Sequence, residues 1–200
     1  VRVLEETVGL QPDGIVLTVM QAEGLQPTID NAINAGIPLV TFDADSPLSK
    51  RYAFLGTGNY HAGVVAARYI GGLASSGKAA VITVPTQNNL AQRTQGFIDT
   101  LAAEFPGIVS GDAYIVDNQN TSEGAASGLS ALLQAEPDIN AVFSTNAQAA
   151  IGAAQALREA GMLEQVSHIG FDFDEGTLDL IDNGQLGATL AQGTWQMGFW

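Results

Sequence analysis

The sequence predicts an α/β fold built around parallel β-sheet. Runs of apolar, β-branched residues alternate with segments in which apolar residues recur at helical spacing, the order expected of repeated strand–helix units. The strand-like runs lead into polar or acidic residues. Small molecules bind outside the carboxyl ends of the strands in open parallel sheets, so these observations also predict a ligand site at the strand ends.

Five strand-like runs follow one another, and each delivers a polar tip. Residues 13–18 end on Thr18, and residues 37–42 lead into Asp43 and Asp45. Residues 80–84 precede the polar segment 87–89, residues 141–145 deliver Asn146, and residues 168–171 lead into Asp172 and Asp174. The tips are neutral or acidic, and their side chains are able to hydrogen-bond a hydroxyl group.

Segments of helical periodicity lie between and around these runs. They span residues 1–10, 24–35, 61–74, 90–105, 122–135, 147–160, 176–183 and 195–200. Gly and Pro at 36–38, 105–107 and 160–161 supply stops between a helix and the following strand. The first segment reads as the last part of a helix and the last segment as the start of one. We therefore expect a leading strand before Val1 and a closing helix around and beyond Trp200, with the fold incomplete at both ends.

Composition favours a folded, acidic protein. The 200 residues are 46% hydrophobic, enough to bury the core of one large domain or of two lobes. Seven basic and 21 acidic residues give a net charge of −14, which repels phosphate backbones and anionic membranes, so nucleic acid is not an expected partner. No apolar run approaches the roughly 20 residues that span a bilayer, so direct membrane insertion is not expected. The absence of cysteine excludes disulfides and thiolate catalysis.

Nucleotide-binding and metal-binding motifs fail on inspection. Residues 72–78 have the spacing of a phosphate loop, but Ala79 replaces the hydroxyl residue and the segment precedes a strand instead of following one. Residues 56–61 begin like a dinucleotide fingerprint, but His61 replaces the third glycine. Residues 172–176 resemble a calcium loop without its closing glutamate. We expect no cofactor and no metal, and we interpret Asp174 as a helix cap.

Catalytic sets are not evident either. The chain has two histidines, His61 and His168, and no Gly-x-Ser-x-Gly elbow. Asp43 and Asp45 suggest a glycosidase acid and base, but both lie at or beyond a strand end, where one acid commonly points into the crevice and the other caps the next turn. The sequence therefore predicts a binding protein and not an enzyme.

A set of motifs along the whole chain gives a specific resemblance. The motifs are DGIVL at 13–17, GIPLVTFD at 36–43, GNYHAG at 58–63, RTQGF at 93–97, PDINAVF at 137–143, Asn146, GFD at 170–172 and ATLAQ at 188–192. Together they resemble the periplasmic sugar-binding proteins of the ribose-binding type, which feed ABC transporters. The resemblance implies two doubly wound parallel-sheet lobes, with a ligand cleft between them that closes over a sugar. It implies a partial N-terminal lobe of residues 1–57 plus 193–200 and a C-terminal lobe of residues 58–192. The chain would cross between lobes near residues 57–59, near residues 192–193, and again beyond Trp200.

The resemblance also implies a set of ligand contacts. Carried over position by position, these are Thr18, Asp43, Asn146, Asp172 and Gln192, with Asn89 and Arg93 as further candidates. A carboxylate accepts from sugar hydroxyls, whereas an amide both donates and accepts. Asn146 and Asp172 have an alternative reading as helix caps, and Gln192 has one as a partner of hinge backbone.

Several positions depart from the ribose-binding pattern. Ala44 and Ala91 stand where ribose binders place arginines, and the remaining Arg93 matches a position that is often structural. Asn88 and Asn89 offer donors instead. The stacking aromatic pair of the family belongs to the first strand that we expect to precede Val1, which leaves Tyr60, Phe173 and Trp195 as local candidates. The pattern therefore implies a small sugar or polyol without singling out ribose.

Two other functions stay open at the level of sequence. Regulators of the lactose-repressor type share this core, but they usually carry a Gly-His-Arg-Arg-like stretch where residues 75–80 read SSGKAA. The sugar-sensing module of a membrane receptor is the other. We expect a monomer that delivers its ligand to an ABC transporter permease in the periplasm or outside the cell, with a lipid anchor as a further option for its attachment.

Overall fold

The computed structural model describes residues 1–199, which form two compact units. Unit 1 comprises Val1–Thr57, Thr86–Asn89 and the described residues from Gly193 on, and unit 2 comprises Gly58–Pro85 and Leu90–Gln192. Every strand pairing in both units is parallel, which confirms the predicted α/β class. The assignment of functional lobes to residue ranges stays a prediction.

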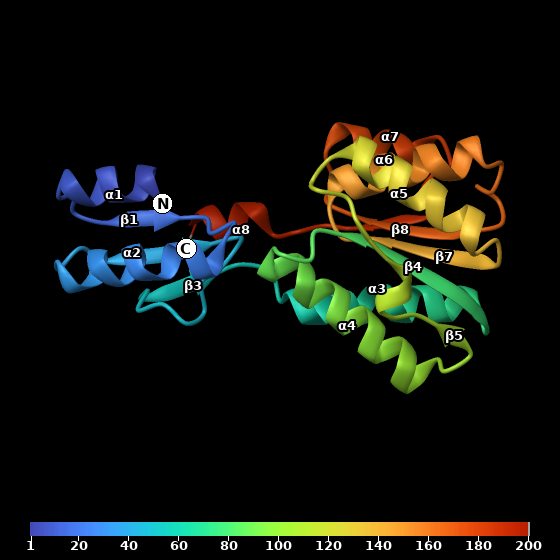
Figure 1. Ribbon diagram of the computed structural model, residues 1–200, viewed down its shortest axis with the longest axis horizontal. Coiled ribbons are helices and arrows are strands. Elements are labelled where there is room, and N and C mark those ends of the chain that lie inside the picture. The colour runs from blue at the N-terminus through green and yellow to red at the C-terminus, as the bar shows by residue number, and fades with distance from the viewer. Residues whose placement is uncertain (200) are drawn as a thin grey trace. The chain divides into compact units, whose positions relative to one another are not determined.

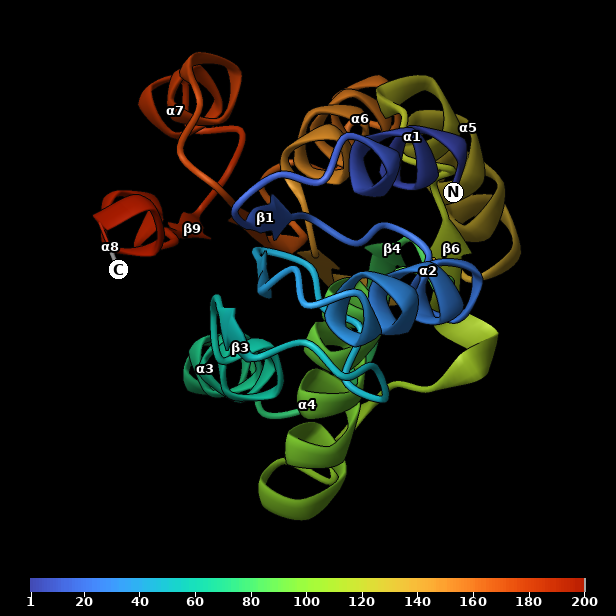
Figure 2. The same cartoon turned by 90° about the vertical axis from the view of Figure 1, so that its left-hand side faces the viewer.

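Unit 1 is a three-stranded sheet with its first two helices packed on one face. Its elements are α1 (Arg2–Gly9), β1 (Ile15–Leu17), α2 (Ala22–Asn34), β2 (Leu39–Phe42), β3 (Ala53–Leu55) and α8 (Thr194–Phe199), with sheet order β1-β2-β3. Figure 2 shows α1 and α2 on the same side of β1 and β3. Leu4 of α1 and Ile29 of α2 pack there in one cluster with Ile15 of β1 and Leu39 of β2. Side chains of a strand alternate between its two faces, and Ile15 and Leu39 are on the buried face.

Unit 2 is a six-stranded sheet in the order β5-β4-β7-β8-β9, with β6 also paired to β4. Its elements are α3 (Asn59–Leu73), β4 (Gly77–Thr83), α4 (Asn88–Glu104), β5 (Ile108–Val109), a 3₁₀ turn (Asp112–Tyr114), β6 (Ile115–Asp117), α5 (Ser122–Ala135), β7 (Ile139–Ser144), α6 (Ala147–Glu159), β8 (Ser167–Phe171), α7 (Glu175–Asp182) and β9 (Ala188–Leu190). In Figure 1, α3 and α4 lie below this sheet, and α5, α6 and α7 lie above it.

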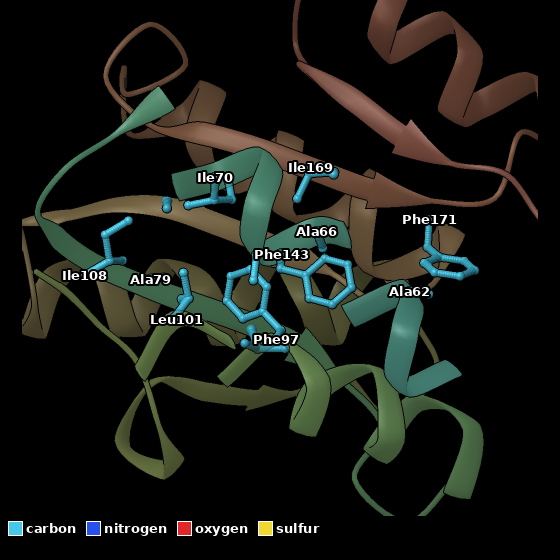
Figure 3. Packing of buried hydrophobic residues seen from close by; sticks show 13 residues of the cluster. Ala62, Ala66, Ile70, Ala79, Phe97, Leu101, Ile108, Phe143, Ile169 and Phe171 are labelled. Atoms are coloured by element: carbon cyan, nitrogen blue, oxygen red, sulfur yellow. The ribbon is translucent and has the colours of Figure 1, made fainter. Parts of the chain in front are cut away.

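Both faces of the unit 2 sheet are buried, which explains the continuous apolar runs of its strands. Val81 of β4 and Phe143 of β7 face α3 and α4, where Phe97 packs against Phe143 with ring centroids 5.0 Å apart (Figure 3). The neighbouring residues Ile82 and Val142 face α5 and α6. Alternate residues of one strand therefore supply two separate cores, as a doubly wound sheet requires.

The structure differs from the sequence expectations mainly in short strands. β3, β5 and β6 have two or three residues each and were not expected as separate strands. They are too short to show alternation, and pairing with β2 or β4 is what defines them. The predicted strand 13–18 is limited to Ile15–Leu17, and the last predicted helix is observed as Thr194–Phe199, with Trp200 outside the described residues. No described helix has both the length and the apolar character needed to cross a membrane.

His168 is a buried polar residue of the unit 2 core. It lies on β8 with 3% of its surface exposed, and its Nε2 is 2.9 Å from the hydroxyl of Ser144. Burial opposes the charged imidazolium and lowers the pKa of His168 to about 4, from about 6.5 for an exposed histidine. The residue is thus a structural part of the core.

His168 should make stability depend on pH between about 6.5 and 4. Above this range the imidazole is neutral in the folded and in the unfolded protein. Below about pH 6.5 the imidazole is protonated in the unfolded chain, whereas in the folded protein it stays neutral down to about pH 4. Acidification across the range should therefore lower the free energy of unfolding by about 3 kcal/mol through this residue alone. Urea unfolding at pH 7 and pH 4.5 should show that acidification lowers the free energy of unfolding less in His168→Gln than in the parent. His61 is exposed, so His61→Gln is the control and should behave like the parent. An equal decrease in the free energy of unfolding in both variants and the parent would contradict this role of His168.

Candidate functional site

Polar residues gather at the carboxyl ends of the unit 2 strands. Thr83 ends β4, Thr145 and Asn146 follow β7, Asp172 follows β8, and Gln192 lies two residues beyond β9. Because these strands are parallel, their carboxyl ends lie along one edge of the sheet. The sequence predicted that strand ends bring polar residues to one edge of the sheet. This is confirmed for the ends of β4, β7, β8 and β9.

Arg93 of α4 lies at the centre of these strand ends, with only 1% of its surface exposed. Its Nε donates to Asn59 Oδ1 (2.9 Å), and its Nη1 donates to the carbonyl oxygen of Thr145 (2.7 Å). Its Nη2 donates to Gln192 Oε1 (3.1 Å), and the guanidinium carbon lies 3.6 Å from the centre of the Phe171 ring. A buried guanidinium requires such bonding, since an unpartnered charge is strongly destabilising in the interior.

Gln192 links this cation to Asp172. Its Nε2 donates to Asp172 Oδ1 (2.7 Å), while its Oε1 accepts from Arg93. A guanidinium is only a donor and a carboxylate is only an acceptor, so the amide of Gln192 has one orientation that satisfies both. Three of the sequence-predicted site residues, Arg93, Asp172 and Gln192, are therefore joined in one hydrogen-bonded chain.

The backbone turns at Asp172 and at Asp43 in the same way. Both residues adopt left-handed conformations, with φ of 74° and 59°, a region in which aspartate is enriched among non-glycine residues. The backbone N–H of Asp172 donates to Leu190 O, and that of Asp43 donates to Leu55 O. Each aspartate thus makes a backbone bond to the neighbouring strand at the point where the chain leaves the sheet.

Asn146 fills one of the two roles that the sequence left open, that of a helix cap. It is the N-cap of α6, where its Oδ1 accepts from the N–H of Ala149 at 2.8 Å. Its Nδ2 is buried and has no hydrogen-bond partner within residues 1–199. Asn89, in the first turn of α4, likewise has a buried Oδ1 without a partner in the described chain. Buried polar atoms are normally bonded, so these atoms are candidates for ligand contact.

In unit 1, Thr18 and Asp43 lie at neighbouring strand ends. Thr18 follows β1 and is exposed, and Asp43 follows β2 and is partly buried. The N–H of Val19 donates to Ala44 O at 3.1 Å, which holds the two strand ends together. Both residues therefore occupy the edge that the sequence assigned to them, whereas their contact with a ligand stays a prediction.

Asp45 and Asp174, the second acids of the pairs Asp43/Asp45 and Asp172/Asp174, both have structural roles. Asp45 is buried, accepts from the hydroxyl of Thr41 at 2.7 Å and forms a two-pronged ion pair with Arg51, in which Nη2 lies 2.6 Å from Oδ2. Asp174 caps α7 by accepting from the N–H of Thr177 at 2.8 Å. Asp45 is thus held by protein groups and is not placed as the partner of Asp43 in acid–base chemistry. No group of three or more potential ligands for a metal ion occurs among residues 1–199.

The three aromatic candidates differ in their surroundings. Tyr60 donates its hydroxyl to Asp99 at 2.9 Å, a bond that raises the pKa of the phenol. Trp195 stacks on Phe199 with ring centroids 5.1 Å apart. Phe173 follows Asp172 directly in sequence and is 46% exposed.

Close packing of α3 on α4 positions Arg93. A Cβ built on Gly63 of α3 would lie 2.0 Å from the carbonyl oxygen of Arg93, and one built on Gly96 of α4 would lie 2.0 Å from that of Tyr60. The two helices therefore approach closely through reciprocal glycines, which brings Arg93 within hydrogen-bonding distance of Asn59 at the start of α3.

Sequence reasoning missed Asn59, Thr145 and Phe171 as partners of Arg93. Asn59 is 4% exposed although it begins a helix next to a predicted crossing, and Phe171 directly precedes a predicted site residue. The available signal was an arginine at helical spacing from Leu90, Phe97 and Leu101, whose charge requires several acceptors nearby. Which acceptors they are depends on contacts between residues 34 to 99 positions apart.

Comparison with known proteins gives a consistent result. A family model described as "Periplasmic binding protein domain" matches residues 1–200. A D-ribose/D-allose-binding protein of Pseudomonas aeruginosa is 29% identical over 96% of this chain. A sugar ABC transporter (sugar-binding protein) from Bacillus halodurans is 40% identical over 100% of the chain and 68% of its own, with a TM-score of 0.89. AraP, an arabinose binding protein from Geobacillus stearothermophilus, is 38% identical over 98% of this chain and 67% of its own, with a TM-score of 0.84.

The chain spans 61% of the length of the Pseudomonas relative. The similarity to the two solved structures covers nearly all of the chain, at identities of 40% and 38%. Both units therefore share their fold with these sugar-binding proteins.

Gly63→Ala should destabilise the protein, because its methyl group would collide with the backbone of α4. We expect a loss of about 1–3 kcal/mol in the free energy of unfolding, the usual range for overpacking. Gly72, in the same helix, is the matched control, since a methyl group there meets nothing within 4 Å. Gly72→Ala should be neutral or stabilising by up to about 1 kcal/mol. Denaturant unfolding compares the two variants, and equal stabilities would show that α3 and α4 do not depend on this close approach.

Proposed function

The chain belongs to the family of periplasmic binding protein domains, and on this premise we propose that it serves a solute-binding protein that captures a small sugar or polyol. The single observation that supports this most is the polar edge of unit 2, where a carboxylate and amides from separate strands are ordered around a buried arginine. Reversible, metal-independent binding is the proposed activity, without catalysis.

The chemistry of the strand ends favours a neutral, polyhydroxylated ligand. Carboxylates at Asp172 and Asp43 are acceptors for hydroxyl groups, and the unpartnered Nδ2 of Asn146 is a donor. The guanidinium of Arg93 is engaged by protein acceptors, and the net charge of −14 opposes anions. A phosphorylated or carboxylated ligand would meet repulsion at the aspartates, whereas a pentose or hexose matches the acceptors and donors.

We assign individual roles as follows. Asp172 accepts through Oδ2, Asn146 donates through Nδ2, and Asn89 accepts through Oδ1. The remaining proposed residues are Gln192 and Arg93 in unit 2 and Thr18 and Asp43 in unit 1. Gln192 and Arg93 act chiefly by holding Asp172, and Thr18 and Asp43 are the ligand contacts that the resemblance implies for unit 1.

Delivery to an ABC transporter permease follows as the proposed physiological role. The Bacillus halodurans protein, which is 40% identical, is described as a sugar ABC transporter (sugar-binding protein). We propose an ABC transporter permease as the partner here, a periplasmic or extracellular location, with or without a lipid anchor, and a monomeric state. The relatives named above carry sugar-binding descriptions, so transport is favoured over a lactose-repressor-type regulator.

Calorimetry on the complete protein tests the proposed function. The panel should contain pentoses, hexoses and polyols, with nucleotides and amino acids as negative classes, and each titration should be run with and without a chelator. We expect saturable binding of at least one neutral sugar or polyol that is unchanged by the chelator. Binding confined to nucleotides or amino acids, or to none of the panel, would refute the proposal.

Asp172→Ala should weaken the binding of that sugar by about 2–4 kcal/mol, the scale for losing a charged hydrogen-bond partner from a desolvated site. Asp174→Ala is the matched control: it removes an N-cap, so we expect a loss of about 1 kcal/mol in stability with affinity unchanged. Calorimetry and denaturant unfolding separate the two effects. The reverse pattern, with affinity lost in Asp174→Ala and kept in Asp172→Ala, would mean that the wrong carboxylate has been assigned to the ligand.

A further inference from the structure

Two segments of the chain that pass between the units both meet Arg93. The chain enters unit 2 at Gly58 and leaves it after Gln192. Asn59, one residue after the entry, accepts from Nε of Arg93, and Gln192, at the exit, accepts from Nη2. One guanidinium thus holds both segments at their unit 2 ends, although the two residues are 133 positions apart in sequence (192 − 59).

The same guanidinium contacts the residues next to the proposed ligand contacts. Nη1 donates to the carbonyl oxygen of Thr145, which directly precedes Asn146. The Phe171 ring, which directly precedes Asp172, lies against the guanidinium at 3.6 Å. A shift of either strand end would therefore disturb the bonds of Arg93, and a shift of Arg93 would disturb both strand ends.

The position of Arg93 is itself tightly constrained. Arg93 is fully buried, and its backbone carbonyl lies so close to Gly63 of α3 that no side chain fits between them. Lysine would not substitute for it, because a single ammonium lacks the planar fork that bonds in three directions while one face stacks on an aromatic ring. The geometry requires arginine at this position.

We propose that Arg93 is a positioning residue that couples the ligand-binding strand ends of unit 2 to the two segments at residues 57–59 and 191–193. This inference rests on the proposed function for its ligand-dependent part. Ligand held by Asp172 acts on Gln192, and through Arg93 it also acts on Asn59. Loss of Arg93 leaves the two segments independent of each other and of the ligand site.

Hydrogen exchange of the free protein tests the coupling without any ligand. In Arg93→Met we expect the amides that donate to the two segments, Ala62 N–H to Gly58 O and Met197 N–H to Gly193 O, to exchange at least tenfold faster than in the parent, while the amides of β4 keep their protection. Arg68→Met is the matched control, because Arg68 also joins α3 to α4, through Glu104 at 2.6 and 2.9 Å, but lies on the surface. Unchanged exchange at both segments in Arg93→Met, or equal acceleration in Arg68→Met, would overturn the proposal.

A double-mutant cycle tests the ligand-dependent part with the sugar identified by calorimetry. Asn59→Ala and Gln192→Ala should be non-additive in affinity by at least fivefold when Arg93 is present and additive within twofold in Arg93→Met. Additivity in both backgrounds would overturn the coupling. If no sugar binds the parent, the proposed function fails, and the exchange experiment still decides the role of Arg93.

Should Arg93→Met fail to fold, Arg93→Lys provides the second variant. Lysine keeps the positive charge but lacks the planar guanidinium that bonds in several directions. The same amides should therefore still exchange at least threefold faster than in the parent. Exchange at the parental rate in Arg93→Lys would show that the charge alone suffices and that the proposed bonding geometry has no role.

Discussion

The organisation of unit 2 depends on a buried positive charge. A guanidinium with 1% exposure persists in a folded protein only when acceptors surround it, and Arg93 finds them on α3, at the end of β7 and beyond β9. Those acceptors lie where the strands end, so the requirement to satisfy one cation also orders the polar edge of the sheet. The carboxylate of Asp172 is oriented by Gln192 as part of the same network.

The two units use the same local design at their last strands. Phe42-Asp43 pairs with Leu55 as Phe171-Asp172 pairs with Leu190, and both aspartates turn the chain with positive φ. In each unit the following strand then leads out of that unit, at Thr57 and at Gln192. A polar strand end and an exit from the unit are therefore adjacent twice in this chain. In the coupling that we propose, this adjacency links the carboxylates of Asp43 and Asp172 to the segments at which the chain leaves each unit.

Much of the framework was predictable from sequence, and the reasons are local. The helices follow from periodicity and Gly or Pro stops. Asp43 and Asp172 were placed correctly at strand ends because each follows an apolar run directly, and Asn146 because it comes three residues after one. The roles of Asp43 and Asp45 could not be separated further, because the distinction rests on the ion pair of Asp45 with Arg51. Asn59 was missed for a similar reason, since its contact with Arg93 exists only after Gly63 and Gly96 bring α3 and α4 together.

The central claim is that Arg93 orders the strand ends of unit 2 so that Asp172 and Asn146 bind a sugar. A crystal structure of the complete protein with its sugar tests this most directly. The account predicts sugar hydroxyls on Asp172 Oδ2 and Asn146 Nδ2, with Arg93 still bonded to Asn59, Thr145 and Gln192. A sugar bound away from these strand ends, or one bonded to Arg93 while Asp172 is turned away, would contradict it.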